Sequence, residues 1–115
     1  MRKILEQNRV DAAAANAIAT FHTNIVQEVE AAVKSHDVVI VGMGQNPVVK
    51  KAKKILEEKK VNYHYLEYGS YLSKWKERLA IKLWSGWPTF PQIYHKGVLI
   101  GGAADLKKYI QSGKL

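Results

Sequence analysis

Hydrophobic positions in the first third of the chain recur at the spacing of an α-helix. Residues 1–36 contain neither glycine nor proline and include an alanine-rich stretch, so helix is expected throughout. Two apolar stripes predict two helices with a break near His22, and Thr23 or Asn24 can cap the second one. The stripes are Val10, Ala14, Ile18 and Phe21, followed by Ile25, Val29, Ala32 and Val33. The first stripe predicts either a helix folded onto its own domain or one that docks a partner.

After residue 36 the hydrophobic pattern changes. Residues 38–41 form a continuous run of mostly β-branched side chains, which predicts a strand buried on both faces. A glycine-containing loop follows. Asn46 and Pro47 then predict a helix start, because asparagine can cap a helix and proline suits its first position. The buried side of this helix is predicted to consist of Val48, Val49, Ala52, Ile55 and Leu56.

The rest of the chain alternates between strand and helix patterns. We expect a strand over 61–68, a helix from Ser70 to Ser85, a hairpin of strands over 92–94 and 98–100, and a helix over 104–111. A right-handed crossover should make the first two strands parallel neighbours. The helix after Ser70 has an apolar stripe that places Trp75 in the core; the stripe is Leu72, Trp75, Leu79 and Leu83. This order predicts an α/β fold with a small mixed sheet.

Composition narrows the class of protein. The chain has 115 residues, which suits one domain, and 47% of them are hydrophobic, so wholesale disorder is excluded. No apolar run approaches the roughly 18–20 residues that a membrane-spanning helix needs. The first residues do not resemble a secretory signal, so we expect a cytoplasmic protein without a membrane partner. The absence of cysteine excludes disulfides, thiol catalysis and thiolate metal sites.

The basic charge is concentrated in one part of the chain. The net charge of +8 comes from residues 37–115, and many of the lysines belong to the helix that begins after Asn46. They predict either a solvated helix face with local ion pairs, such as Lys53 with Glu57, or a patch for nucleic acid or an acidic partner. Nucleic acid is not the expected partner, because no aromatic residues interleave with the lysines. The four histidines are scattered, so no metal site is expected.

One stretch of sequence carries a family resemblance. Residues 87–94, Trp-Pro-Thr-Phe-Pro-Gln-Ile-Tyr, followed by Lys96-Gly97 and Ile100-Gly101-Gly102, are similar to glutaredoxins, most of all to the monothiol branch. Residues 78–82, Arg-Leu-Ala-Ile-Lys, resemble the helix before that motif. The resemblance covers residues 23–115 and implies a thioredoxin fold, with a four-stranded mixed sheet flanked by helices. Residues 1–22 would be an N-terminal helical extension.

The resemblance also identifies a degenerate redox centre. Glutaredoxins place their nucleophilic cysteine at the start of the first long helix, where the helix end lowers its pKa. The matching position here is Asn46, and Val49 stands where a resolving cysteine would be. An amide oxygen can neither attack a disulfide nor hold iron, so neither thiol–disulfide exchange nor an iron–sulfur cluster is expected. Asn46 could face a ligand or serve only as a helix cap.

A glutathione site is implied by the same resemblance. In the family the residue before a cis-proline pairs its backbone with glutathione, and here that residue is Phe90, between Thr89 and Pro91. The amides of the last helix would receive a carboxylate, and a lysine on the preceding helix would contact the glycyl carboxylate. The candidates in these roles are Gly102, Ala103, Ala104 and Lys82. The family commonly has an aspartate at the position of Ala104, and here the aspartate comes one residue later, as Asp105. The resemblance therefore implies that the backbone contacts to glutathione are kept and that the side-chain contacts are partly lost.

Three functional hypotheses follow. The first is a redox-inactive, non-catalytic binding or regulatory module that holds a protein partner through the old substrate groove or the N-terminal helix, with a homodimer through that helix as one form. The second is a sensor that binds glutathione without covalent chemistry. The third is weak electrostatic binding of nucleic acid or an acidic partner. None of them involves catalysis by a thiol.

Overall fold

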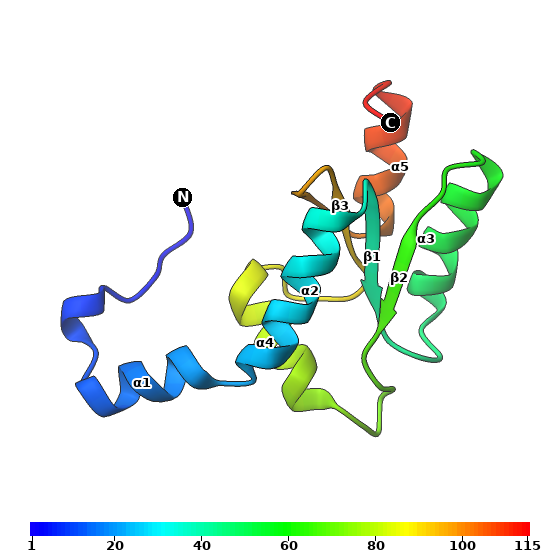
Figure 1. Cartoon of the computed structure of the whole chain (residues 1–115). Helices are drawn as coiled ribbons and strands as arrows, with labels where there is room; N and C mark the ends of the chain where they lie inside the picture. Colours follow the sequence, from blue (N-terminus) through cyan, green and yellow to red (C-terminus); the bar gives the residue numbers. More distant parts are fainter.

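A four-stranded mixed sheet forms the centre of the computed structural model, which describes residues 1–115 (Figure 1). The strand order is β2-β1-β3-β4, with β1 parallel to β2 and antiparallel to β3. This is the predicted α/β architecture. In chain order the elements are the 3₁₀ turn η1 (Gln7–Arg9), α1 (Ala12–Thr20), α2 (Thr23–Ser35), β1 (Val38–Gly42), α3 (Pro47–Glu58), β2 (His64–Glu67), α4 (Trp75–Ser85), β3 (Gln92–His95), β4 (Val98–Gly101) and α5 (Ala103–Gln111).

Strand β1 is the inner strand that the sequence predicts. All five of its residues are buried, and Ile40 pairs with Tyr65 of β2 on one side and Ile93 of β3 on the other. Its β-branched side chains fill both faces of the sheet, as expected for a strand with helices on either side. Strand β1 thereby fixes where the loop after Gly42 leaves the sheet.

The two faces of the sheet have separate hydrophobic cores. Helices α2 and α4 cover one face, and α3 and α5 cover the other (Figure 1). Val29 of α2 and Ile81 of α4 are completely buried on the first face, and Leu56 of α3 and Leu106 of α5 on the second. The sheet therefore separates two helical layers that do not share a core.

Helix α4 differs from its prediction. It begins at Trp75 rather than after Ser70, and Lys74 precedes it in the left-handed region with φ of 55°. The buried guanidinium of Arg78 donates to the carbonyl of Tyr68 at 2.9 Å, which holds the loop before the helix. The predicted apolar stripe is exposed, and the prediction that Trp75 lies in the core is wrong; the exposed members are Leu72, Trp75, Leu79 and Leu83.

The reason lies in the opposite side of α4. Ala80 and Ile81 are both buried, Ile81 in the core on this face of the sheet, and Trp84 packs beside Tyr94. Because Ala80, Ile81 and Trp84 point inward, Leu79 and Leu83 lie on the other side of the helix and face outward. Hydrophobic spacing alone could not distinguish these two sides of the helix.

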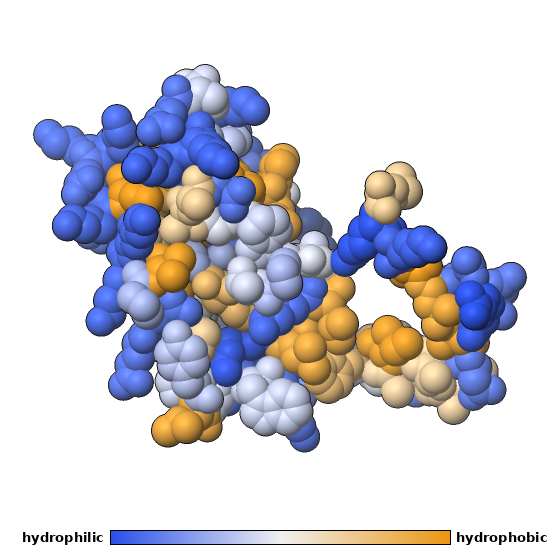
Figure 2. Space-filling view, turned by 180° about the vertical axis from the view of Figure 1, so that it is seen from behind, coloured by the Kyte–Doolittle hydropathy of each residue, from blue (hydrophilic) through white to orange (hydrophobic).

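The N-terminal segment leaves the body of the molecule. The break predicted near His22 is present, with His22 in the left-handed region at φ of 44°. Helix α1 has no buried residue and extends away from the sheet, and the segment before it turns back, so that the Arg2 guanidinium lies against Gly86. Figure 2 shows this arm beside the body, with an opening between them. No helix is long and apolar enough to span a membrane.

Candidate functional site

The side chain of Asn46 caps α3. Its Oδ1 accepts hydrogen bonds from the backbone N–H groups of Val48 and Val49, at 2.9 and 3.1 Å, and the residue is only 9% exposed. Pro47 takes the first helical position, where an N–H would have no partner. The N-terminal end of α3 could otherwise stabilise an anion, but its free N–H groups are already bound by the side chain of Asn46. Val49 is buried in the core.

The loop before Asn46 is held closely against its neighbours. The N–H of Gly44 donates to the carbonyl of Gly69 at 2.7 Å, and that of Tyr68 to the carbonyl of Gly42 at 2.9 Å. A Cβ at Gly42 would lie 2.8 Å from Cγ1 of Val49, closer than packed carbon atoms approach one another, so glycine is required there. These contacts fix the position of Asn46 at the end of β1.

The segment before β3 has the expected cis peptide bond, between Phe90 and Pro91. Phe90 and Pro91 are buried, and Thr89 is exposed. The ammonium of Lys82 lies 5.7 Å from the centre of the Phe90 ring. The structure therefore brings Lys82 of α4 close to the Thr89–Pro91 segment.

The start of α5 carries a cap that the sequence interpretation missed. The carboxylate of Asp105 accepts a hydrogen bond from the N–H of Gly102 at 3.0 Å. Gly102 is the residue before the helix, and Asp105 is the third helical residue, the position from which an acidic side chain reaches back. The three-residue spacing from Gly102 to Asp105 was the feature of the sequence that could have predicted this cap. Ala103 is buried and Ala104 exposed, and the amides of both have no acceptor within the helix.

Sheet topology brings these residues to one edge. Asn46 follows the end of β1, Pro91 directly precedes β3, and Gly102 directly follows β4. Because β3 runs antiparallel to both β1 and β4, the start of β3 and the ends of the other two strands meet at the same edge. The predicted candidates thus lie together although they are far apart in sequence.

A buried hydrogen-bond donor without a partner lies beside this edge. The indole Nε1 of Trp87 is buried and makes no hydrogen bond, and it is 3.9 Å from where a Cβ on Gly102 would be. Buried donors are nearly always paired, because an unpaired one loses its hydrogen bonds to water without replacement. The sequence motif includes Trp87 but does not indicate that its N–H would be unpaired.

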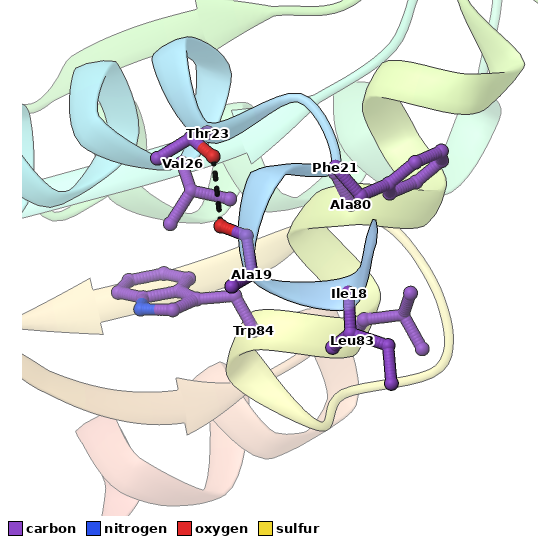
Figure 3. Close-up of a pocket in the computed structure, with 8 residues that line it drawn as sticks. All are labelled: Ile18, Ala19, Phe21, Thr23, Val26, Ala80, Leu83 and Trp84. Atoms are coloured by element: carbon purple, nitrogen blue, oxygen red, sulfur yellow. Dashed lines mark hydrogen bonds between the residues drawn. The ribbon is translucent and has the colours of Figure 1, made fainter. Parts of the chain in front are cut away.

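An apolar hollow of about 240 Å³ lies on the face of the sheet covered by α2 and α4 (Figure 3). Side chains from the end of α1, the start of α2 and the second half of α4 surround it. The lining residues are Ile18, Ala19, Phe21, Thr23, Val26, Ala80, Leu83 and Trp84. The Thr23 hydroxyl donates to the carbonyl of Ala19 at 3.0 Å, which ties α1 to α2 at this point. Ile18 and Leu83 remain 67% and 64% exposed, so the hollow has an apolar rim.

Comparison with protein-family models matches residues 38–100 to glutaredoxin. A Dictyostelium discoideum glutaredoxin-like protein is 46% identical over 100 residues, covering 87% of this chain and 81% of that protein. The chain belongs to the glutaredoxin family. Monothiol members are among its relatives: monothiol glutaredoxin-S17 of Arabidopsis thaliana is 44% identical over 52 residues, which cover 44% of this chain and 11% of that protein.

Solved glutaredoxin structures show the same fold. The buckwheat glutaredoxin–glutathione complex superposes with a TM-score of 0.70 at 21% identity, covering 81% of this chain and 84% of that one. Reduced glutaredoxin C1 from Populus tremula x tremuloides gives a TM-score of 0.72 at 20% identity, with 85% and 84% covered. The predicted thioredoxin fold with its four-stranded mixed sheet is confirmed.

This glutaredoxin-family chain has no cysteine, so its own side chains can supply no thiolate. Asn46 offers an amide oxygen that is already engaged by two backbone N–H groups. An iron–sulfur cluster requires thiolate ligands, and the residues present at this edge do not fit such a group. No set of three or more His, Cys, Asp or Glu side chains is placed to hold a metal ion. The hydrogen-bond donors that this edge retains are the indole N–H of Trp87 and the backbone N–H groups of Ala103 and Ala104.

Proposed function

We propose that this member of the glutaredoxin family is a redox-inactive, non-catalytic binding module. The observation that carries the proposal is the environment of Asn46. Its amide stands at the family's nucleophile position and is engaged in capping α3, and the chain has no thiol to replace it. The scaffold around it, including the Thr89–Pro91 segment and Lys82, is nevertheless kept.

The apolar hollow beside α1 supports a protein partner. A helix of nine residues such as α1 is marginal in water by itself, and this one buries none of its side chains. Ile18 on α1 and Leu83 on α4 line the hollow and expose apolar surface, and Leu79, one turn before Leu83, is exposed as well. A second copy of the chain, which brings the same helix, is the partner we propose for this surface.

Two measurements test the module. A glutathione-coupled disulfide reductase assay of the purified protein is expected to show no turnover above buffer, and measurable turnover would contradict the proposal. Sedimentation equilibrium is expected to show a dimer that Leu83→Glu weakens. A wild-type chain that stays monomeric at high concentration would remove the second copy as the partner.

Cytoplasmic location stays a prediction, which imaging of a tagged chain checks.

Glutathione is a second candidate ligand, and the unpaired Nε1 of Trp87 favours it. A bound carboxylate or carbonyl at the start of α5 could accept from this donor beside Gly102. The Thr89, Phe90, Ala103, Ala104 and Lys82 groups would complete the site, and binding would be non-covalent. Calorimetric titration with reduced glutathione should give heat that Trp87→Phe diminishes, since phenylalanine keeps the ring and removes the donor. No heat at millimolar ligand would exclude this candidate.

A further inference from the structure

Helices α3 and α5 form a basic surface on the face of the sheet away from the apolar hollow. They pack side by side, and hydrophilic side chains crowd the part of the molecule opposite the N-terminal arm (Figures 1 and 2). The lysines of this surface are Lys50, Lys51, Lys53, Lys54, Lys59, Lys60, Lys107 and Lys108. Packing of α5 against α3 thus brings Lys107 and Lys108 to the lysines of α3, although nearly fifty residues separate Lys60 from Lys107 in the sequence.

No ion pair within the chain engages the lysines of this surface. The two ion pairs in the structure, Glu6 with Arg9 and Glu30 with Lys34, both lie in the N-terminal third. The predicted pairing of Lys53 with Glu57 is wrong. Glu57 instead accepts a hydrogen bond from the Tyr63 hydroxyl at 2.7 Å.

The ammonium of Lys53 is held elsewhere, 3.5 Å from the centre of the Tyr65 ring. The acidic side chain nearest the start of α5 is also engaged, because Asp105 caps that helix through Gly102. Apart from Lys53, the lysines of this surface are exposed, and none of them is paired with a carboxylate of its own chain.

A groove of about 520 Å³ runs between the two helices. Two half-buried side chains, Ile55 of α3 and Ile110 of α5, provide its apolar lining. Three exposed lysines, Lys51, Lys59 and Lys107, also line it, against one acidic residue, Glu58. The groove thus combines a recessed apolar floor with a positively charged rim.

We propose that this groove binds an acidic segment of a partner protein. An apolar side chain of the segment rests on Ile55 and Ile110, and its carboxylates lie beside Lys51, Lys59 and Lys107. Charge complementarity brings the segment to the surface, and burial of its apolar side chain gives it a defined position. This site is separate from the edge that carries Asn46, so it does not depend on the function proposed above.

The lining of the groove favours a protein segment over nucleic acid or a membrane. No arginine is present to grip phosphate with a bidentate pair, and no aromatic side chain lines the groove for base stacking. A phosphate backbone would leave the isoleucine floor unused. A membrane-binding face needs projecting apolar side chains, whereas Ile55 and Ile110 are half-buried between the helices.

The first test compares two fluorescein-labelled dodecapeptides of aspartate, glutamate and serine that differ only at the centre, leucine in one and serine in the other. Fluorescence anisotropy with the full chain at physiological salt should show saturable binding, roughly five- to tenfold tighter for the leucine peptide. Equal affinities, or no binding of either peptide, would overturn the proposal. A short duplex DNA or phosphatidylserine vesicles binding more tightly than the leucine peptide would overturn the choice of partner.

Matched charge-reversal variants locate the site. Lys51→Glu, Lys59→Glu and Lys107→Glu together should weaken binding of the leucine peptide by more than about tenfold. The control combines Lys3→Glu, Lys76→Glu and Lys96→Glu, three exposed lysines outside the groove with the same change in net charge. The control variant should lose much less affinity for the leucine peptide. Circular dichroism checks that both variants fold. An equal loss in both would show attraction to net charge alone and overturn the proposed site.

Discussion

At the scale of the residue, Asn46 is a helix cap whose side chain is engaged by the backbone at the start of α3. The amide oxygen of Asn46 accepts from the first N–H groups of α3, as a thiolate at this position could, but it brings no nucleophile. The sequence left open whether Asn46 faces a ligand or caps the helix, and the structure confirms the cap. The capping bonds make its contribution to stability measurable.

Asn46→Ala should lower the free energy of unfolding by about 1 kcal/mol, because two N–H groups at the start of α3 lose their acceptor. Asn46→Asp should leave stability unchanged or raise it, since a carboxylate keeps the acceptor and suits the positive end of the helix. Urea denaturation at neutral pH measures both variants. An alanine variant as stable as wild type would show that the cap contributes nothing.

Asn46→Cys should create a thiol whose pKa lies below the ordinary value of about 8.5, because the N–H groups of Val48 and Val49 stabilise a thiolate. Ser35→Cys is a matched control, since it places an exposed thiol at the opposite type of helix end, the last residue of α2. Thiolate absorbance against pH measures both. Equal pKa values in the two variants would count against the helix-end effect at residue 46.

Tyr94 gives a prediction at high pH. Burial raises the pKa of its hydroxyl from 10.0 to about 12, and that hydroxyl donates to Oε1 of Gln92 at 2.9 Å. The folded chain holds this proton more tightly than the unfolded chain, so its contribution to stability is complete below pH 10 and is lost as pH rises toward about 12.

Comparison of wild type with Tyr94→Phe isolates this effect. The other tyrosines with raised pKa values, Tyr63, Tyr65 and Tyr68, are the same in both proteins. The free energy of unfolding should fall more steeply in wild type than in the variant between about pH 10 and pH 12. Parallel curves of unfolding free energy against pH for the two proteins would contradict this role of Tyr94.

At the scale of the element, hydrophobic spacing predicted the order of helices and strands because each pattern reflects burial on one side or on both. It failed for α4, because the exposed Leu79 and Leu83 keep helical spacing, and so do Ala80 and Trp84 on the side that packs inward. The cap from Asp105 to Gly102 could have been predicted from its spacing. The unpaired Nε1 of Trp87 could not, because it depends on what surrounds a side chain in three dimensions.

Helix α1 should be dispensable for folding of the monomer. Deletion of residues 1–20 removes no buried side chain, so the free energy of unfolding should change by less than about 1 kcal/mol. Val29→Ala in α2, where the side chain is completely buried, should cost about 2 kcal/mol by comparison. Denaturant unfolding at low protein concentration measures both. A deletion as costly as Val29→Ala would show that α1 belongs to the fold of the domain.

At the scale of the whole molecule, the sequence predicted the net charge but not its arrangement. The lysines of residues 50–60 were visible as a group, whereas their approach to Lys107 depends on α3 and α5 sharing one face of the sheet. The candidate site residues come from the resemblance to glutaredoxins, because their sequence matches that family's motif. Their convergence on one edge follows from the antiparallel pairing of β3 with β1 and β4.

The separation of the helical layers by the sheet has a consequence for stoichiometry. The apolar hollow belongs to α1, α2 and α4, and the basic groove to α3 and α5, with four strands between them. Molecules seated in the two places would not collide, and neither would have to leave before the other arrived. The two proposals are therefore compatible: a second copy in the hollow and an acidic segment in the groove would occupy one chain of 115 residues at the same time.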